Sequence, residues 1–295
     1  MVCELKSGNA AHHCQRSCLN VNPNRVPGAG PLSLILGLWH YRQLIAAMTK
    51  REVIGRYRGS VMGLAWSFFN PILMLAVYTF VFSEVFQSRW GGQDTAKGGY
   101  AILLFVGMIV HGLFAECANR SATLIVANSN YVKKVIFPLE ILTVVTLGSA
   151  LFHTCISLIV LLLAQFLLTH ELHASAVFFP LVLMPLLIAT LGISWWLAAL
   201  GVYLRDVGQV IVVLTTVLLF LSPVLYPVAA IPQVYQPWLK LNPLTYIIEE
   251  SRNVLLFGLF PQWDSLGMAL LIAFDIAAAG FWFFQKTRKG FADVI

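Results

Sequence analysis

The segment Lys50–Phe86, KREVIGRYRGSVMGLAWSFFNPILMLAVYTFVFSEVF, decides the fold because a basic stretch passes directly into a long apolar one. The last cation of this stretch is Arg58, and between Val61 and Val85 the only charged side chain is Glu84. Cations collect on the side of a membrane from which they are not translocated. The segment therefore predicts a cytoplasmic surface followed by the first membrane span.

The composition of the whole chain agrees with a membrane protein. Its 295 residues are 59% hydrophobic and 11% charged, and the mean hydropathy is +0.79. These values exclude an ordinary soluble globular chain. The net charge of +6 is explained by cations at the ends of spans, and no basic run with interleaved aromatic residues remains for nucleic acid. We expect no nucleic-acid partner.

The five cysteines predict neither a disulfide framework nor a metal site. Their number is odd, with three in the N-terminal tail and two in predicted spans. In the tail, His12 and His13 stand beside Cys14 and Cys18, but this spacing matches none of the usual zinc patterns. We expect no metal and no catalytic residue in this chain.

The chain divides into three predicted parts. Residues 1–31 are polar and rich in Asn, Pro and Gly, which predicts a disordered cytoplasmic leader. Residues 32–50 predict an amphipathic helix in the cytoplasmic interface, because apolar side chains share one helical face. Residues 51–295 predict an all-α membrane domain with six transmembrane helices. The apolar face of the interfacial helix is formed by Leu34, Leu38, Tyr41, Ile45 and Met48.

The six predicted spans are separated by polar or proline-rich segments. Residues 222–263 carry six prolines and have no apolar run long enough to cross about 30 Å of hydrocarbon. This segment predicts either short re-entrant helices or a lid of exterior helices, with a helix over residues 244–260 in both cases. The predicted spans are residues 61–85, 100–127, 141–169, 175–203, 207–225 and 266–284.

Lys and Arg residues orient these spans. Four of the 19, Arg89, Lys97, Lys240 and Arg252, fall in predicted exterior segments, and the others fall inside when Arg120 is counted there. Such an excess of interior cations places both termini in the cytoplasm.

The first junction has two further features. Gly55, Gly59 and Gly63 recur every four residues, which predicts one face of a helix that another backbone can approach closely. Asn70-Pro71 interrupts the first span, so we expect a bend or break there.

Aromatic residues on the first span leave two interpretations open. Tyr78 and Phe82 continue a stripe at spacing four that starts at Met74 and ends at Phe86. Such a stripe is typical of lipid-facing or core aromatics. It also suits a ring-lined path for sugar, because flat aromatic faces stack on pyranose faces.

Four separated motifs, in order, resemble one family. The junction GRYRGSVMGLAWSFFNPILMLAVYTFVF, the loop NSNYVKKVIFPLEIL, the turn YLRDVGQ and the run SPVLYPVAAIP with LNPLTYIIEESRNVLLFG are similar to the membrane subunits of bacterial ABC exporters for O-antigen, capsular polysaccharide and teichoic acid. The resemblance covers about residues 34–295 and leaves residues 1–31 outside it.

This resemblance implies a homodimer in the bacterial inner membrane, bound to a separate ATP-binding subunit, that moves a lipid-linked polysaccharide outward. The chain has no G-x-x-x-x-G-K-[ST] loop to cradle phosphates. ATP and Mg²⁺ are therefore expected in the partner, no cofactor is expected in this chain, and membrane lipid is its remaining partner.

The resemblance also implies site residues. A substrate channel lined by the first and fifth spans would be formed by Trp66, Phe69, Tyr78, Phe82, Phe220 and Tyr226. The cytoplasmic entrance would be flanked by Arg51, Arg56 and Arg58, which suit a diphosphate-linked lipid head group. Coupling to the ATPase would use Tyr131, Lys133, Lys134 and Phe137.

Two alternatives stay open. The same architecture could export a drug or a small lipid. A proton-coupled secondary transporter would instead use Asp275, Glu116 and His153, although that class often shows inverted pairs of broken helices, and none is evident here.

Overall fold

The computed structural model describes residues 37–85, 99–132, 137–170, 172–240 and 242–295. Within these ranges the chain is helical and contains no strand, so the all-α prediction is confirmed. Three predictions fall outside the described residues in whole or in part. The predicted leader lies outside them, as do Lys133 and Lys134, and so does Leu34 of the predicted interfacial helix.

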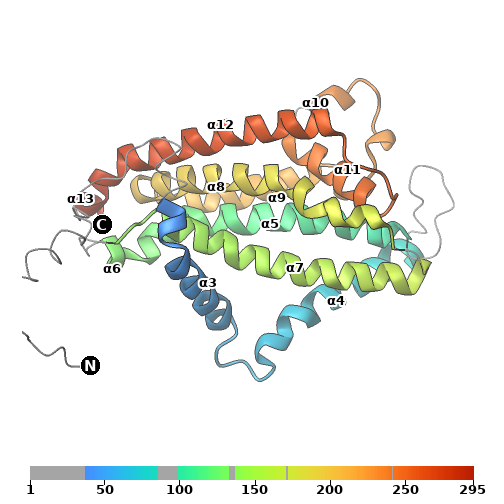
Figure 1. The fold of residues 1–295 in the computed structure, drawn as a ribbon, viewed down its shortest axis with the longest axis horizontal. Coiled ribbons are helices and arrows are strands. Elements are labelled where there is room, and N and C mark those ends of the chain that lie inside the picture. The colour runs from blue at the N-terminus through green and yellow to red at the C-terminus, as the bar shows by residue number, and fades with distance from the viewer. Residues whose placement is uncertain (1–36, 86–98, 133–136, 171, 241) are drawn as a thin grey trace, which may run out of the picture.

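Four long helices run side by side and form the body of the molecule (Figure 1). They are α5 (Gly99–Ala127), α7 (Ile141–Thr169), α8 (Phe179–Tyr203) and α12 (Trp263–Thr287). Helix α5 is the most buried, because α4, α7, α8, α9 and α11 all contact it. Helix α12 packs on α8 at one edge of the bundle, and α4 lies at the opposite edge (Figure 1).

Glycines allow two of these helix pairs to approach closely. A Cβ at Gly201 of α8 would collide with the carbonyl oxygen of Ala122 in α5. Gly192 of α8 and Gly280 of α12 likewise face each other, so that a Cβ on either would collide with the other helix's backbone. Small residues at helix contacts are the usual device for close packing inside a membrane.

The helix before the first span extends further toward the C-terminus than the sequence predicts. Helix α3 runs from Arg42 to Arg56, so the boundary predicted at residue 50 falls inside it. Tyr41, Ile45 and Met48 pack against the core cluster around Trp195, as expected for the apolar face of this helix. Whether α3 lies in the interface of a membrane stays a prediction.

A tight turn over residues 57–62 separates α3 from the first span, and it corrects the glycine prediction. Gly59 and Gly63 have φ values of 88° and 51°. These positive values belong to the left-handed region that glycine adopts without a Cβ penalty. The spacing of Gly55, Gly59 and Gly63 therefore reflects the end of one helix and the reversal after it, not one helical face.

The first span is a composite helix. A short 3₁₀ turn (Gly63–Ala65) leads into α4 (Trp66–Thr79), and a π-helical turn (Phe80–Val85) follows. Pro71 lies inside α4, which continues through it. Of the bend or break predicted at Asn70-Pro71, the break is therefore wrong and the bend stays a prediction.

In the part of the chain that the structure describes, five helical segments are long and apolar enough to cross a membrane: Gly63–Phe82, Gly99–Ala127, Ile141–Thr169, Ala174–Tyr203 and Trp263–Val294. The remaining predicted span contains α9 (Val207–Leu221), an apolar helix of 15 residues. At 1.5 Å per residue it is about 22 Å long, which is short for a hydrocarbon core of about 30 Å.

The proline-rich segment forms short helices, α10 (Gln236–Lys240) and α11 (Pro243–Leu255). Helix α11 begins cleanly because the Asn242 side chain accepts a hydrogen bond from the backbone of Leu244 at 3.0 Å and Pro243 suits the first turn. It ends five residues before the predicted limit at Phe260. At the other end of the bundle lie α6 (Ser129–Val132) and α13 (Phe291–Val294) (Figure 1).

Candidate functional site

A network of four charged side chains joins α3 to α5. Arg56 pairs with Glu116, and Arg120 pairs with Glu52. Arg120 also lies 3.5 Å from Glu116 on its own helix. The side chains are between 23% and 36% exposed, so each pair alone stabilises only modestly. Together they fix the end of α3 against the most buried helix of the bundle.

Tyr57 and His153 extend this network to α7. The Tyr57 hydroxyl lies 3.4 Å from Nδ1 of His153, and their rings meet edge to face. Burial raises the pKa of Tyr57, and the neighbouring Arg56 opposes that rise. The turn after α3 is thus held to three helices at one point.

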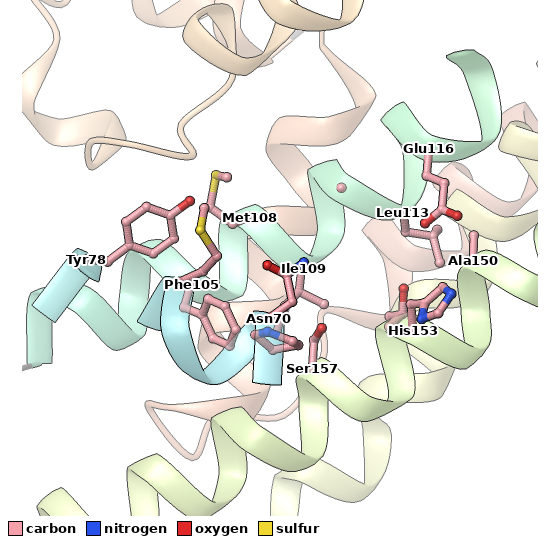
Figure 2. Close-up of a pocket in the computed structure, with 14 residues that line it drawn as sticks. Asn70, Tyr78, Phe105, Met108, Ile109, Leu113, Glu116, Ala150, His153 and Ser157 are labelled. Carbon is pink, nitrogen blue, oxygen red and sulfur yellow. The ribbon is translucent and has the colours of Figure 1, made fainter. Parts of the chain in front are cut away.

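Next to the network lies a cavity of about 220 Å³ between α4, α5 and α7. Figure 2 shows Glu116 and His153 at one end of it and Tyr78 and Met108 at the other. Its wall is mostly apolar, with polar groups gathered toward the Glu116 end. The polar lining residues are Asn70, Glu116, His153, Thr154 and Ser157, and Tyr78 adds a hydroxyl group to them.

The aromatic stripe of α4 faces inward. Met74 and Tyr78 line the cavity, and Phe82 stacks on Tyr100 of α5 with ring centres 5.3 Å apart and planes at 18°. Trp66 and Phe69 do not line this cavity; both are exposed, and their rings meet edge to face at 5.4 Å. The four predicted channel residues on the first span therefore do not share one face.

The two channel residues after α4 sit near the end of α9. Phe220 is 59% exposed. The Tyr226 hydroxyl donates a hydrogen bond of 2.6 Å to the backbone carbonyl of Phe220, so these two residues are brought together. Their role in a channel stays a prediction.

The predicted entrance and the predicted coupling loop meet. Arg51 donates a hydrogen bond of 2.9 Å to the Tyr131 hydroxyl. The Tyr131 ring stacks on Phe137 with centroids 4.4 Å apart. Arg58 is exposed in the turn after α3. Arg51 and Arg56 thus hold other parts of the chain, whereas Arg58 extends toward solvent.

Sequence reasoning missed Arg288, which clamps the same loop. Its guanidinium donates at 2.8 Å to the Glu140 carboxylate and at 3.1 Å to the carbonyl of Phe137. Trp195 of α8 donates to the backbone carbonyl of Glu140 at 3.0 Å. The end of α12 therefore holds the start of α7. The sequence showed Arg288 as one of several interior cations, with no signal for its partner.

Sequence reasoning also missed the role of Arg252 at the other end of the bundle. This residue of α11 is 1% exposed and donates at 3.0 Å to the carbonyls of Leu103 in α5 and Val224 after α9. It also pairs with Glu249 at 2.9 Å. Burial lowers the pKa of Arg252 to about 10, which leaves it charged at neutral pH.

The segment after α9 is where these bonds are needed. Pro223 and Pro227 end helical hydrogen bonding, and the buried carbonyl of Val224 then requires another donor. Tyr100 of α5 supplies a second contact of the same kind, donating at 2.7 Å to the carbonyl of Leu225. Arg252 and Tyr100 together fasten residues 222–226 to α5. We call this arrangement the exterior clasp, after the side of the membrane on which the sequence predicts it.

Beside the clasp, Glu250 is 3% exposed. Its Oε2 has no hydrogen-bond partner among the described residues. Burial raises the pKa of Glu250, the Asn253 side chain and the Gln262 backbone oppose that rise, and Glu249 adds to it.

The three residues that a proton-coupled transporter would use, Asp275, Glu116 and His153, do not all lie together. Glu116 and His153 line the same cavity. Asp275 lies on the exposed side of α12, which packs on α8 at the far edge of the bundle (Figure 1). The described residues thus form no chain of groups linking the three.

A family profile described as "ABC-2 type transporter" matches residues 43–256. The matched range contains the charge network, the cavity and the exterior clasp.

Curated proteins are similar over most of the chain. The "O-antigen export system permease protein RfbA" of Myxococcus xanthus is 27% identical over 266 residues, covering 90% of this chain and all of that protein. A Klebsiella pneumoniae protein of the same name is 23% identical, covering 90% and 99%. The "Polysialic acid transport protein KpsM" of Escherichia coli is 24% identical, covering 75% and 84%.

Proposed function

The chain belongs to the ABC-2 type transporter family of membrane proteins, and on this premise we propose that it is the transmembrane subunit of an ATP-driven polysaccharide exporter. The observation that carries the proposal is similarity along nearly the whole chain to proteins named as O-antigen export permeases and a polysialic acid transporter. Those names favour a polymer over a drug or small lipid, and no feature of the fold favours the latter.

In this proposal the chain conducts and its partner supplies energy. An ATP-binding subunit with its Mg²⁺ docks on the end of the bundle that carries α6 and α13. The stacked pair Tyr131 and Phe137 supports this role, because Arg51 and Arg288 connect that loop to α3 and α12. Lys133 and Lys134 stay proposed contacts with the partner.

The proposed complex contains two copies of the chain, each with six spans, in the bacterial inner membrane with both termini in the cytoplasm. Helix α9 is the fifth span in this arrangement, and its length requires thinned lipid or cover from the second copy. The apolar exposed faces of α4 and α9 support such cover, since large side chains line both.

The proposed path for the polymer follows α4 and α9. Trp66, Phe69 and Phe220 are supported most directly, because their rings are exposed. Tyr78 contributes through the cavity, and Tyr226 through its bond to Phe220. Phe82 supports α4 by stacking on α5. Arg58 is the entrance cation best placed to meet a diphosphate-linked lipid, since Arg51 and Arg56 already hold protein partners.

The proposal is tested by export in cells that lack the native chain. Complementation with the wild type should restore surface polymer, whereas Phe69→Ala combined with Phe220→Ala should reduce it and leave co-purification with the ATP-binding subunit intact. Phe80→Ala is the matched control, because Phe80 is also an exposed aromatic residue of the first span and lies outside the proposed path. Loss of polymer in the control alone, or full export in the double variant, would contradict the proposed path.

A further inference from the structure

Asp275 lies at the midpoint of α12. The helix has 25 residues, from Trp263 to Thr287, and Asp275 is twelve residues from each end. At 1.5 Å per residue it is about 18 Å from either end. A hydrocarbon core of about 30 Å has its centre about 15 Å from each surface. If α12 spans the membrane, the carboxyl group is therefore near the middle of the bilayer.

The carboxyl group points away from the bundle. The buried side of α12 is formed by Leu266, Ala273, Gly280, Phe281 and Phe284, whereas Asp275 is exposed. No hydrogen bond or ion pair joins it to any part of the chain that the structure describes. Aspartate is too short to reach the membrane surface as lysine does. A charged side chain at this depth is unfavourable in lipid and is stabilised by a partner carried on protein.

The surface around Asp275 suits a second helix. On the same side, Ala278 and Ala279 follow at three and four residues, and Gly267 lies two turns before it. Small residues beside a polar one are typical of contacts between transmembrane helices. Met268, Leu271 and Trp282 extend this exposed side toward both ends of the helix. We call this surface the outer face of α12.

The chemistry of the occupant follows from the depth. Lipid head groups stay at the surface, so the donor that meets the carboxyl group has to be carried on protein. A second copy placed along α4 and α9 does not reach this face, because α12 lies at the opposite edge of the bundle from α4 (Figure 1). A second copy meeting α12 itself, parallel and about a twofold axis, would set one carboxyl group against another.

We propose that the outer face of α12 docks a transmembrane helix of a different protein, which carries a hydrogen-bond donor such as Lys, Arg, Asn or Gln near mid-depth. This interaction surface is separate from the proposed polymer path and from the surface proposed for the ATP-binding subunit. Its specificity comes from Asp275, and the alanines allow the close approach.

The test uses the chain with its ATP-binding subunit in lipid vesicles. The five native cysteines are replaced by serine, and Ala278→Cys supplies a single thiol on the outer face. The probe is a designed Leu–Ala helix of about 21 residues, long enough to span, with a central Lys and a Cys one turn away. A second helix has Leu in place of the Lys. Copper phenanthroline oxidises neighbouring thiols to a disulfide, and the crosslinked fraction is measured.

We expect the Lys helix to crosslink more than the Leu helix. Asp275→Leu should reduce the Lys-helix yield about threefold to tenfold, the range of interhelical hydrogen bonds in membranes. Asp264→Leu removes an acid from the first turn of the same helix and should leave the yield unchanged. A cysteine at Ile72, on the exposed side of α4, should give little crosslinking.

Equal yields with both helices, or an Asp275→Leu variant that crosslinks as well as the parent, would overturn the proposal. A dominant disulfide between two chains at position 278 would also overturn it, by showing that a second copy occupies the face. ATPase activity of the complex verifies that the Asp275→Leu protein is folded. If that activity is lost, Asp275→Asn replaces it, and its yield must fall between those of the parent and the Leu-helix control.

Discussion

Replacing Arg252 by Met tests the exterior clasp. Methionine replaces the apolar stem of the arginine side chain but removes the guanidinium donors to the carbonyls of Leu103 and Val224. Hydrogen bonds from a charged donor contribute about 1.5–3 kcal/mol each, so the two together predict a loss of about 3–6 kcal/mol. Removing one partner of a buried charged set costs a similar amount.

The ion pair with Glu249 adds little to this loss. The Glu249 side chain is 41% exposed, and pairs open to solvent contribute at most about 1 kcal/mol. Glu249→Gln is therefore the matched control and should be mild. Arg252→Lys keeps the charge but loses the fork that reaches two carbonyls, so it should cost about half as much as Arg252→Met. Tyr100→Phe should cost about 1 kcal/mol through loss of its hydrogen bond to the Leu225 carbonyl.

The measurement is a denaturing-detergent titration of the purified complex, read as the free energy of unfolding. A second readout is the labelling of Leu225→Cys by a membrane-impermeant maleimide, which should be slow in the parent and fast with Arg252→Met. If Glu249→Gln destabilises as strongly as Arg252→Met, the ion pair holds the segment and the argument from the carbonyls is refuted.

Three further changes test other contacts. Gly201→Ala should prevent α8 from packing on α5, because its Cβ would collide with the Ala122 carbonyl; yield of folded protein measures this. Arg56→Glu should loosen α3, seen as faster trypsin cleavage, and adding Glu116→Arg should restore protection by reversing the pair. Because burial raises the pKa of Glu250 above its ordinary 4.5, the folded state binds its proton more tightly. Stability should therefore fall as pH rises from about 4.5 toward that raised pKa, and Glu250→Gln should flatten the slope measured by detergent titration.

Hydropathy and charge were sufficient to predict the long helices. The second and third spans match α5 and α7 closely, and the fourth matches the segment that ends at Tyr203, because an apolar helix in a bilayer has little freedom in length or position. The same reasoning found the apolar face of α3, since Ile45 and Met48 share a side at helical spacing.

Backbone geometry at the first junction was not predictable in this way. A four-residue glycine spacing has two meanings, and the positive φ of Gly59 and Gly63 shows that a turn uses them. Pro71 was expected to break α4, but it lies in the second turn of the helix, where the interruption is tolerated.

Side-chain partners were the least predictable part. Arg56 was assigned to a substrate entrance because it is cationic, yet it meets a carboxylate 60 residues away. Arg252 and Arg288 likewise contact segments far from them in sequence. Spacing along one helix reveals faces, whereas pairing across helices depends on how those faces are rotated in the bundle.

The most direct measurement is polymer translocation by the purified chain and its ATP-binding subunit in sealed vesicles. With lipid-linked polysaccharide on the nucleotide side, transport should require ATP hydrolysis by the partner and should continue when an ionophore removes the proton gradient. Transport by this chain alone that is driven by the gradient, or that persists without nucleotide, would contradict an ATP-driven exporter subunit.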